Sequence, residues 1–271
     1  MRTAFLLAAA MFALPAITPV AAADLSLPAK EPPYPTGYQW TGFYIGGNGG
    51  YEFGNVKDFG SVTVGGVPAA GGVTVSGFSS SGSNSGGFGG LQFGFNYEFP
   101  SHIVAGFEAD ADWGNLNGSS AGCAGGVCSS GSSNINNFGT LRIRLGYAFD
   151  NVLLFGTGGG AWADTRWSST ITAVPAGAFP GLAVPANSPY STFAIGYTAG
   201  GGVEVGVLHN VTFKAEYLWE QFNGVAQTYN YGFADAAGTI PVVGNHSASM
   251  TLNTVRVGFN ILLPAAPGWF R

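Results

Sequence analysis

Apolar and polar side chains alternate along much of this chain with a period of two, and residues 138–164 show what the pattern predicts. From Leu141 to Phe149 every second residue is Leu, Ile or aromatic, while Arg142 and Arg144 lie on the opposite face. Side chains of a β-strand point alternately to two faces, so this segment is expected to be a strand with one apolar and one polar face. A two-residue Asp-Asn turn leads into a second strand, which must run antiparallel to the first.

The same alternation predicts eight strands, joined by links that alternate between short and long. An even number of antiparallel strands with such links is the plan of bacterial outer-membrane barrels, in which about ten residues per tilted strand cross the membrane. We therefore expect an all-β fold, an eight-stranded antiparallel transmembrane up-and-down β-barrel with its short turns in the periplasm. The strands are expected at 43–54, 87–99, 103–113, 192–207, 211–222 and 250–263 and as a hairpin within 138–164. The long links are expected at about 55–85, 114–137, 166–191 and 223–249.

The polar faces of these strands carry most of the charged residues, and they are expected to point into the barrel because the apolar faces meet lipid. An eight-stranded barrel is only wide enough for side chains to fill it. The charges are therefore expected to neutralise one another as a plug, with the acids of 108–112 beside Arg142 and Arg144. A narrow charge-lined ion path is the alternative, which the excess of acids keeps open. The expected interior charges are Glu52, Glu98, Glu108, Asp110, Asp112, Arg142, Arg144, Glu204, Lys214, Glu216, Glu220 and Arg256.

Aromatic residues gather at the ends of the expected strands, on their apolar faces. This placement is typical of the two aromatic girdles of a transmembrane barrel. The residues expected in the outer girdle are Phe53, Trp113, Trp219 and Phe222. Those expected in the periplasmic girdle are Tyr97, Phe99, Tyr147, Phe149 and Phe259.

The two ends of the chain carry segments of another kind. Arg2, an apolar run over 5–14 and three alanines at 21–23 are typical of a cleaved export signal. We therefore expect the protein in the bacterial outer membrane. The expected organisation is a signal peptide over 1–23, a Pro-rich periplasmic tail over 24–39, the barrel over 40–263 and a C-terminal extension over 264–271.

The amino-acid composition further restricts the class of protein. The chain is 46% hydrophobic, 14% aromatic and only 8% charged, against about 25% charged residues in an ordinary soluble domain. Its 45 glycines argue against a helix-rich fold. The formal net charge of −5 and the absence of a run of Lys and Arg argue against nucleic acid as a partner. The expected surroundings are outer-membrane lipid and lipopolysaccharide.

Few residues suggest a chemical site. Cys123 and Cys128 lie close together in one long link, and in an oxidising compartment we expect them to form a disulfide. A metal site is the alternative, but two sulfur ligands with no histidine nearby are too few. The three histidines are scattered, and no motif brings a nucleophile, a base and an acid together. No catalytic, cofactor-binding or metal-binding residue is therefore predicted, and an enzyme is not expected.

Four segments resemble one known family. WTGFYIGGNGGYEFG at 40–54, LQFGFNYEF at 91–99, LRIRLGYAF at 141–149 and TVRVGFNIL at 254–262 are similar to segments of the small outer-membrane immunogenic, porin-like proteins of alphaproteobacteria. The resemblance covers essentially the whole mature chain. It implies an eight-stranded surface barrel inserted by the barrel assembly machinery, in a family variously described as antigens, porins or haem binders. It implies no catalytic residues.

The end of the chain departs from this family. Such proteins usually end on an aromatic residue that closes the last strand and acts as the assembly signal, whereas this chain ends on Arg271 after Phe270. Either the signal is displaced or an internal aromatic residue such as Phe259 serves.

The function expected from these observations is a structural, surface-exposed role as an integral outer-membrane β-barrel. A small-solute porin with a narrow charge-lined path is the first alternative. A surface adhesin or ligand binder, for example of haem, acting through the outer loops is the second. The sequence predicts no oligomeric state.

Overall fold

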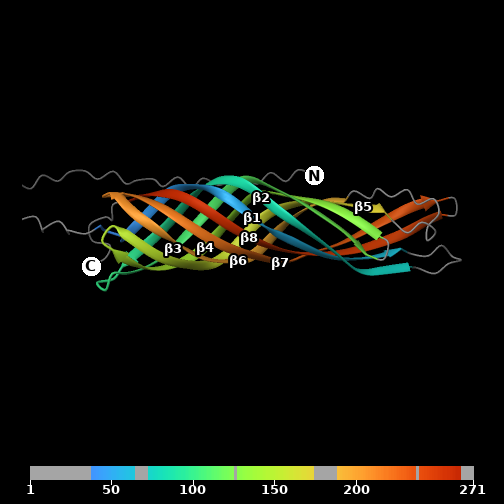
Figure 1. The fold of residues 1–271 in the computed structure, drawn as a ribbon, viewed down its shortest axis with the longest axis horizontal. Helices are drawn as coiled ribbons and strands as arrows, with labels where there is room; N and C mark the ends of the chain where they lie inside the picture. The colour runs from blue at the N-terminus through green and yellow to red at the C-terminus, as the bar shows by residue number, and fades with distance from the viewer. Residues whose placement is uncertain (1–37, 65–72, 125–126, 174–187, 236–237, 264–271) are drawn as a thin grey trace, which may run out of the picture. The chain divides into compact units, whose positions relative to one another are not determined.

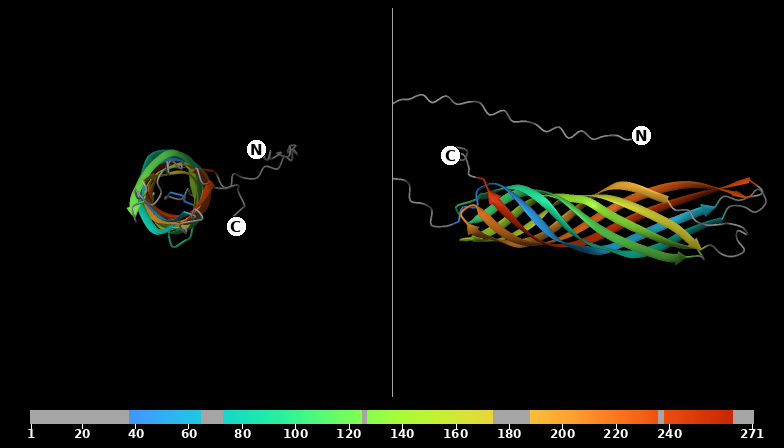
Figure 2. Two further views of the ribbon diagram at one scale, coloured as in Figure 1. Left: turned by 90° about the vertical axis from the view of Figure 1, so that its right-hand side faces the viewer. Right: turned by 90° about the horizontal axis from the view of Figure 1, so that it is seen from above.

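The computed structural model describes residues 38–64, 73–124, 127–173, 188–235 and 238–263. They form eight β-strands that close into one barrel in chain order, seen from the side in Figure 1 and end-on in Figure 2. The expected fold is confirmed. The expected signal peptide, the C-terminal extension and nearly all of the Pro-rich tail lie outside the described residues. The strands are β1 (Gly42–Val64), β2 (Val73–Glu98), β3 (Ile103–Ala124), β4 (Val127–Phe149), β5 (Val152–Ala173), β6 (Ser188–Leu208), β7 (Val211–Asp235) and β8 (Gly238–Leu262).

Each strand pairs antiparallel with its neighbours, and β1 closes the ring by pairing with β8. Ring closure satisfies the backbone groups that hydrocarbon cannot bond. The three short turns lie at one end, called the periplasmic end below. His102 and Asp150 take positive φ angles of 62° and 52° in two of these turns, so the chain reverses within a few residues. No helix long and apolar enough to cross a membrane occurs among the described residues.

The expected faces of the strands are found in the structure. On β4, Ile143 is 74% exposed whereas its neighbour Arg142 is 1% exposed. An apolar belt therefore surrounds the barrel, and most of the charged side chains lie inside it. One residue expected in the outer girdle is placed differently, because Phe222 is only 1% exposed. It shares the inward positions of β7 with Glu220, two residues earlier, as the period of two requires.

The strands are much longer than expected. The predicted long links at 55–85, 114–137 and 223–249 are mostly strand, and in the link at 166–191 residues 166–173 and 188–191 are strand. Each strand has 21 to 26 residues. At ~3.3 Å per residue and a tilt of ~40°, such strands span about 55 Å or more along the barrel axis, roughly twice the ~25 Å apolar band of a transmembrane barrel. The wall therefore continues beyond the membrane at its outer end. Composition rich in Gly, Ser and Asn predicted loops, but ladder bonds to neighbouring strands override such weak preferences.

β-Bulges interrupt the ladder in the outer half of the barrel. A bulge places an extra residue in one strand, bends it and shifts its faces. On β4, inward positions change from odd to even numbers across the bulge, so Ile135 and Phe138 are both buried. Three of the register shifts lie between Trp113 and Leu116 on β3, between Ile135 and Asn137 on β4 and between Phe222 and Val225 on β7.

Candidate functional site

The inside of the barrel is filled in layers, and the layer at the periplasmic end is mostly apolar. Trp40, just before β1, is 1% exposed, and its Nε1 donates a hydrogen bond of 3.1 Å to the carbonyl oxygen of Asp150 in the β4–β5 turn. The Tyr38 ring packs 4.7 Å from that of Trp40 and covers Gly206, where an added Cβ would lie 2.4 Å from the ring. Burial, and then the nearby Glu204, raise the pKa of Tyr38, so its hydroxyl stays neutral. The buried residues that complete this layer are Val104, Ala148, Leu153 and Phe155.

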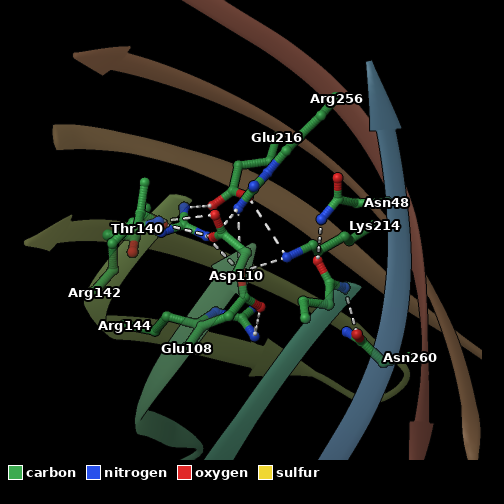
Figure 3. Close-up of polar contacts among 12 residues, drawn as sticks. Asn48, Glu108, Asp110, Thr140, Arg142, Arg144, Lys214, Glu216, Arg256 and Asn260 are labelled. Atoms are coloured by element: carbon green, nitrogen blue, oxygen red, sulfur yellow. Dashed lines mark hydrogen bonds and ion pairs between the residues drawn. The ribbon is translucent and has the colours of Figure 1, made fainter. Parts of the chain in front are cut away.

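A cluster of ion pairs fills the next layer, with Glu108 of β3 at its centre (Figure 3). Oε1 of Glu108 accepts hydrogen bonds from Arg142 Nη2 at 2.5 Å and from Lys214 Nζ at 2.6 Å. Oε2 accepts from the Tyr44 hydroxyl at 2.8 Å and lies 3.5 Å from Arg144 Nη1. Because β3 and β7 are four strands apart in a ring of eight, the pair of Glu108 with Lys214 spans the lumen.

Two arginines bind the other central acids. Arg142 Nη1 lies 2.6 Å from Glu216 Oε1, and Arg256 Nε lies 2.8 Å from Oε2 of the same carboxylate. Both guanidinium groups also reach Asp110 Oδ2, at 2.9 Å and 3.1 Å. The side chains of these four residues are 0–1% exposed. Charges buried this deeply are tolerated only when they are paired and hydrogen-bonded, which is what this arrangement provides.

The ion pair of Arg144 with Glu204, together with neutral groups, forms the periplasmic side of the cluster. Glu204 accepts hydrogen bonds from Arg144 Nη2 at 2.6 Å, from the Thr212 hydroxyl at 2.5 Å and from the Asn260 amide at 2.7 Å. The Arg144 guanidinium also lies over the Phe155 ring, 4.0 Å from its centroid. Through this cation–π contact the ion-pair cluster packs against the apolar layer at the periplasmic end.

Three acids on the outer side of the cluster have fewer ion-pair and hydrogen-bond partners than the central acids. Glu52 and Glu220 are 1% and 3% exposed, and Asp112 is 2% exposed. Asp112 Oδ2 lies 3.6 Å from Arg256 Nη1, but Asp112 Oδ1 and Glu52 Oε2 have no hydrogen-bond partner in the part of the chain that the structure describes. Counted over the buried described residues, seven acids face four bases. Among the described residues, the interior therefore holds three more acidic than basic side chains.

An apolar layer closes the interior above these acids. Its most deeply buried large side chains are Leu116, which is 0% exposed, and Ile135, Phe222 and Leu252, which are each 1% exposed. The layer draws residues from all eight strands, as a closed core must. Its members are Val56, Phe88, Leu116, Ile135, Phe138, Ala161, Ala163, Trp167, Ala194, Phe222, Ala248, Met250 and Leu252.

Eleven of the twelve charges expected inside the barrel are buried there, and Glu98 is the exception. Glu98 is the last residue of β2, and its side chain is 20% exposed at the periplasmic rim. Its Oε2 accepts from the backbone N–H of Trp40 at 3.4 Å, and its Oε1 lies 3.4 Å from His102 Nδ1. Glu98 pairs in register with Val104, four residues along β3 from Glu108, so it lies at the rim beside Trp40 and outside the ion-pair cluster.

Sequence reasoning missed the residues that shut the two ends of the interior. Tyr44 was detectable, because it shares the inward positions of β1 with Glu52. Part of the outer apolar layer was hidden because Val56, Leu116, Ile135, Trp167 and Ala248 lie where long links were expected. Trp40 lies before β1, so no alternation marked it.

The two cysteines face each other at the tip of the β3–β4 hairpin. Cys123 and Cys128 are register partners, and their Sγ atoms are joined in a disulfide 2.08 Å long. Over the described ranges no three His, Cys, Asp or Glu side chains are placed to hold a metal ion.

The known proteins that this chain matches are described as outer-membrane proteins. The chain matches the outer membrane protein beta-barrel domain over residues 4–234. It is 33% identical over 222 residues to the 31 kDa outer-membrane immunogenic protein of Brucella melitensis biotype 1, covering 78% of this chain and 82% of the relative. It is 29% identical over 234 residues to the 22 kDa outer membrane protein of Rhizobium leguminosarum bv. viciae, covering 86% of this chain and 82% of the relative.

Two solved structures of outer-membrane proteins also match this chain. The outer membrane protein OprG of Pseudomonas aeruginosa has 13% sequence identity and a TM-score of 0.47, covering 83% of this chain and 99% of that one. The outer membrane protease OmpT of Escherichia coli has 9% identity and a TM-score of 0.39, covering 80% of this chain and 97% of that one.

Proposed function

This chain belongs to the outer membrane protein beta-barrel family and lies in the bacterial outer membrane, and we propose that within this family it is a closed, non-conducting barrel with a structural, surface-exposed role. Its signal peptide over 1–23 and its tail over 24–39 are part of this proposal. So is the absence of a catalytic role.

The observation that supports the proposal is the filling of the interior. Lys214 and Glu108 pair across the lumen at 2.6 Å, with both side chains 0% exposed. Trp40 and its neighbours lie below this level, and the layer around Leu116 and Phe222 lies above it. A hydrated ion would have to break buried ion pairs and then cross two apolar layers, each of which removes its water.

The test is conductance of the purified barrel in planar lipid bilayers, with a general porin inserted into the same bilayers as the positive control. We expect insertion without steady channel current, because a hydrated ion would have to cross both apolar layers. A steady, sizeable current from the unmodified protein would contradict the proposal.

A narrow porin is the second candidate, and the acidic excess is the observation that favours it. Glu52, Asp112 and Glu220 would attract cations to the outer side of the cluster. If this candidate holds, the current is cation-selective and Glu52→Gln lowers the selectivity. The outer apolar layer argues for the closed barrel instead.

The barrel's length supports surface exposure. Strands of 25 and 26 residues are longer than the apolar band of a transmembrane barrel requires, which favours an outer end that projects from the membrane. The Brucella relative is named an immunogenic protein, and we extend surface exposure to this chain on that basis. Adhesion or ligand binding through the outer loops stays an open alternative, because the loop tips lie largely outside the described residues. We also propose contact with lipopolysaccharide and insertion by the barrel assembly machinery.

A further inference from the structure

The barrel wall is paired all the way round near the membrane but not near its outer end. The ladder between β6 and β7 joins residues 196–208 to residues 211–222. β6 begins earlier, at Ser188, and β7 continues to Asp235. In these outer parts, the described residues of β6 pair with β5 and those of β7 pair with β8, but no pairing joins β6 to β7.

We call this region the seam, made of 188–195 on β6 and 223–230 on β7. Each of its two strands has one edge whose N–H and C=O groups carry no ladder bonds. On the other edge of each seam strand the ladder continues: β6 stays paired with β5, and β7 stays paired with β8. The seam therefore consists of two ordered strand edges and not of frayed ends.

A β-bulge on β7 explains where the seam begins. Phe222 pairs with Met250, and the next register pair is Val225 with Ala248, so two residues of β7 oppose one residue of β8. The β6–β7 ladder stops at Phe222, directly before this bulge. A bulge bends and twists its strand, so we attribute the end of the β6–β7 ladder to this bulge.

The seam lacks most of the features that protect strand edges. Proteins usually protect an edge with charged side chains, especially Lys, with proline or by covering it. Neither 188–195 nor 223–230 contains a charged residue, and Pro189 is the one proline in them. Phe193 and Ile195 are 62% and 71% exposed, which places the lower end of the seam at the margin of the apolar belt and the rest beyond it.

We propose that the seam is a docking site for an extended, uncharged segment of a second polypeptide, which adds to the free edge of β6 as a further strand. Unpaired edge N–H and C=O groups are the features that strand addition uses. Lipid chains offer no hydrogen bonds to these groups. A second copy of this barrel does not fit either. Strands tilted ~40° in two upright barrels related by a two-fold axis along the membrane normal cross at about 80°, too steeply to form a ladder.

The test uses a fluorescent octapeptide probe, acetyl-(Thr-Val)4-amide, added to the full-length barrel in detergent micelles. A matched probe carries N-methyl groups on alternate amides, which removes donors from one edge and leaves the side chains unchanged. We expect the methylated probe to bind on the order of tenfold or more weakly, because several ladder hydrogen bonds are lost. Hydrogen exchange should show that the unmethylated probe protects the amides of 190–195.

A change in the bulge provides the matched variants. Deletion of Gly224 gives β7 and β8 a one-to-one register, so β7 should continue beside β6 and probe binding should fall on the order of tenfold or more. Asn223→Ala keeps the chain length and the bulge, and it should bind as the unmodified protein does. Equal binding of both probes, no protection of 190–195, or unchanged binding by a folded deletion variant would each overturn the proposal. If the deletion variant does not fold, the two measurements on the unmodified protein decide.

Discussion

Arg144 is the residue whose removal best separates a packed interior from an open one. Its guanidinium binds Glu204 at 2.6 Å and the Tyr44 hydroxyl at 2.8 Å, and its side chain is 2% exposed. Arg144→Ala leaves buried acids without their partner, so we expect the free energy of unfolding to fall by about 3–5 kcal/mol. The measurement is the denaturant midpoint in detergent, together with bilayer conductance, which should stay near zero.

Two further variants control this experiment. Arg166 is exposed on β5, so Arg166→Ala should leave the midpoint nearly unchanged, as for other exposed charges. Arg144→Met combined with Glu204→Gln removes both charges of one pair, and it should recover part of the lost stability. An Arg144→Ala protein of unchanged stability that conducts ions would refute the packed interior.

At the scale of elements, the β3–β4 hairpin carries the disulfide at its tip. Cys123 and Cys128 should resist alkylation in exported protein until a reductant is added. Changing both to Ser should leave the barrel folded, because the bond closes a hairpin that the ladder already pairs. Mass spectrometry after alkylation, with and without reduction, measures this. Ready alkylation of unreduced protein would show that the thiols are free.

At the scale of the whole molecule, the closed ladder should make the barrel resistant to mild detergent. Backbone hydrogen bonds run between strands around the full ring, and the apolar belt binds detergent as it binds lipid. Unboiled and boiled samples should therefore migrate differently on a detergent gel, and circular dichroism of the unboiled form should show β-structure. Identical migration combined with a helical spectrum would contradict the barrel.

The sequence by itself determined the strand count, the closure and the inward charges. Period-two alternation places Arg142 inside and Ile143 outside whatever the neighbouring strands are, because it follows from strand geometry alone. The short turns determined which strands are hairpin partners. Inward position alone would also have placed Phe222 correctly, since it lies two residues after Glu220.

Only the tertiary structure decided which side chains meet and where the wall ends. Glu108 binds Lys214 across the lumen because barrel closure brings β3 opposite β7, and no local pattern encodes that distance. Glu98 lies at the rim, paired in register with Val104, where it meets Trp40, a residue outside every alternating run. Strand length and the seam depend on ladder bonds between segments far apart in the chain, and one ladder stops directly before a one-residue bulge at 223–224. Alternation along one strand determines a face, whereas register between strands determines a neighbour, and only the closed barrel sets that register.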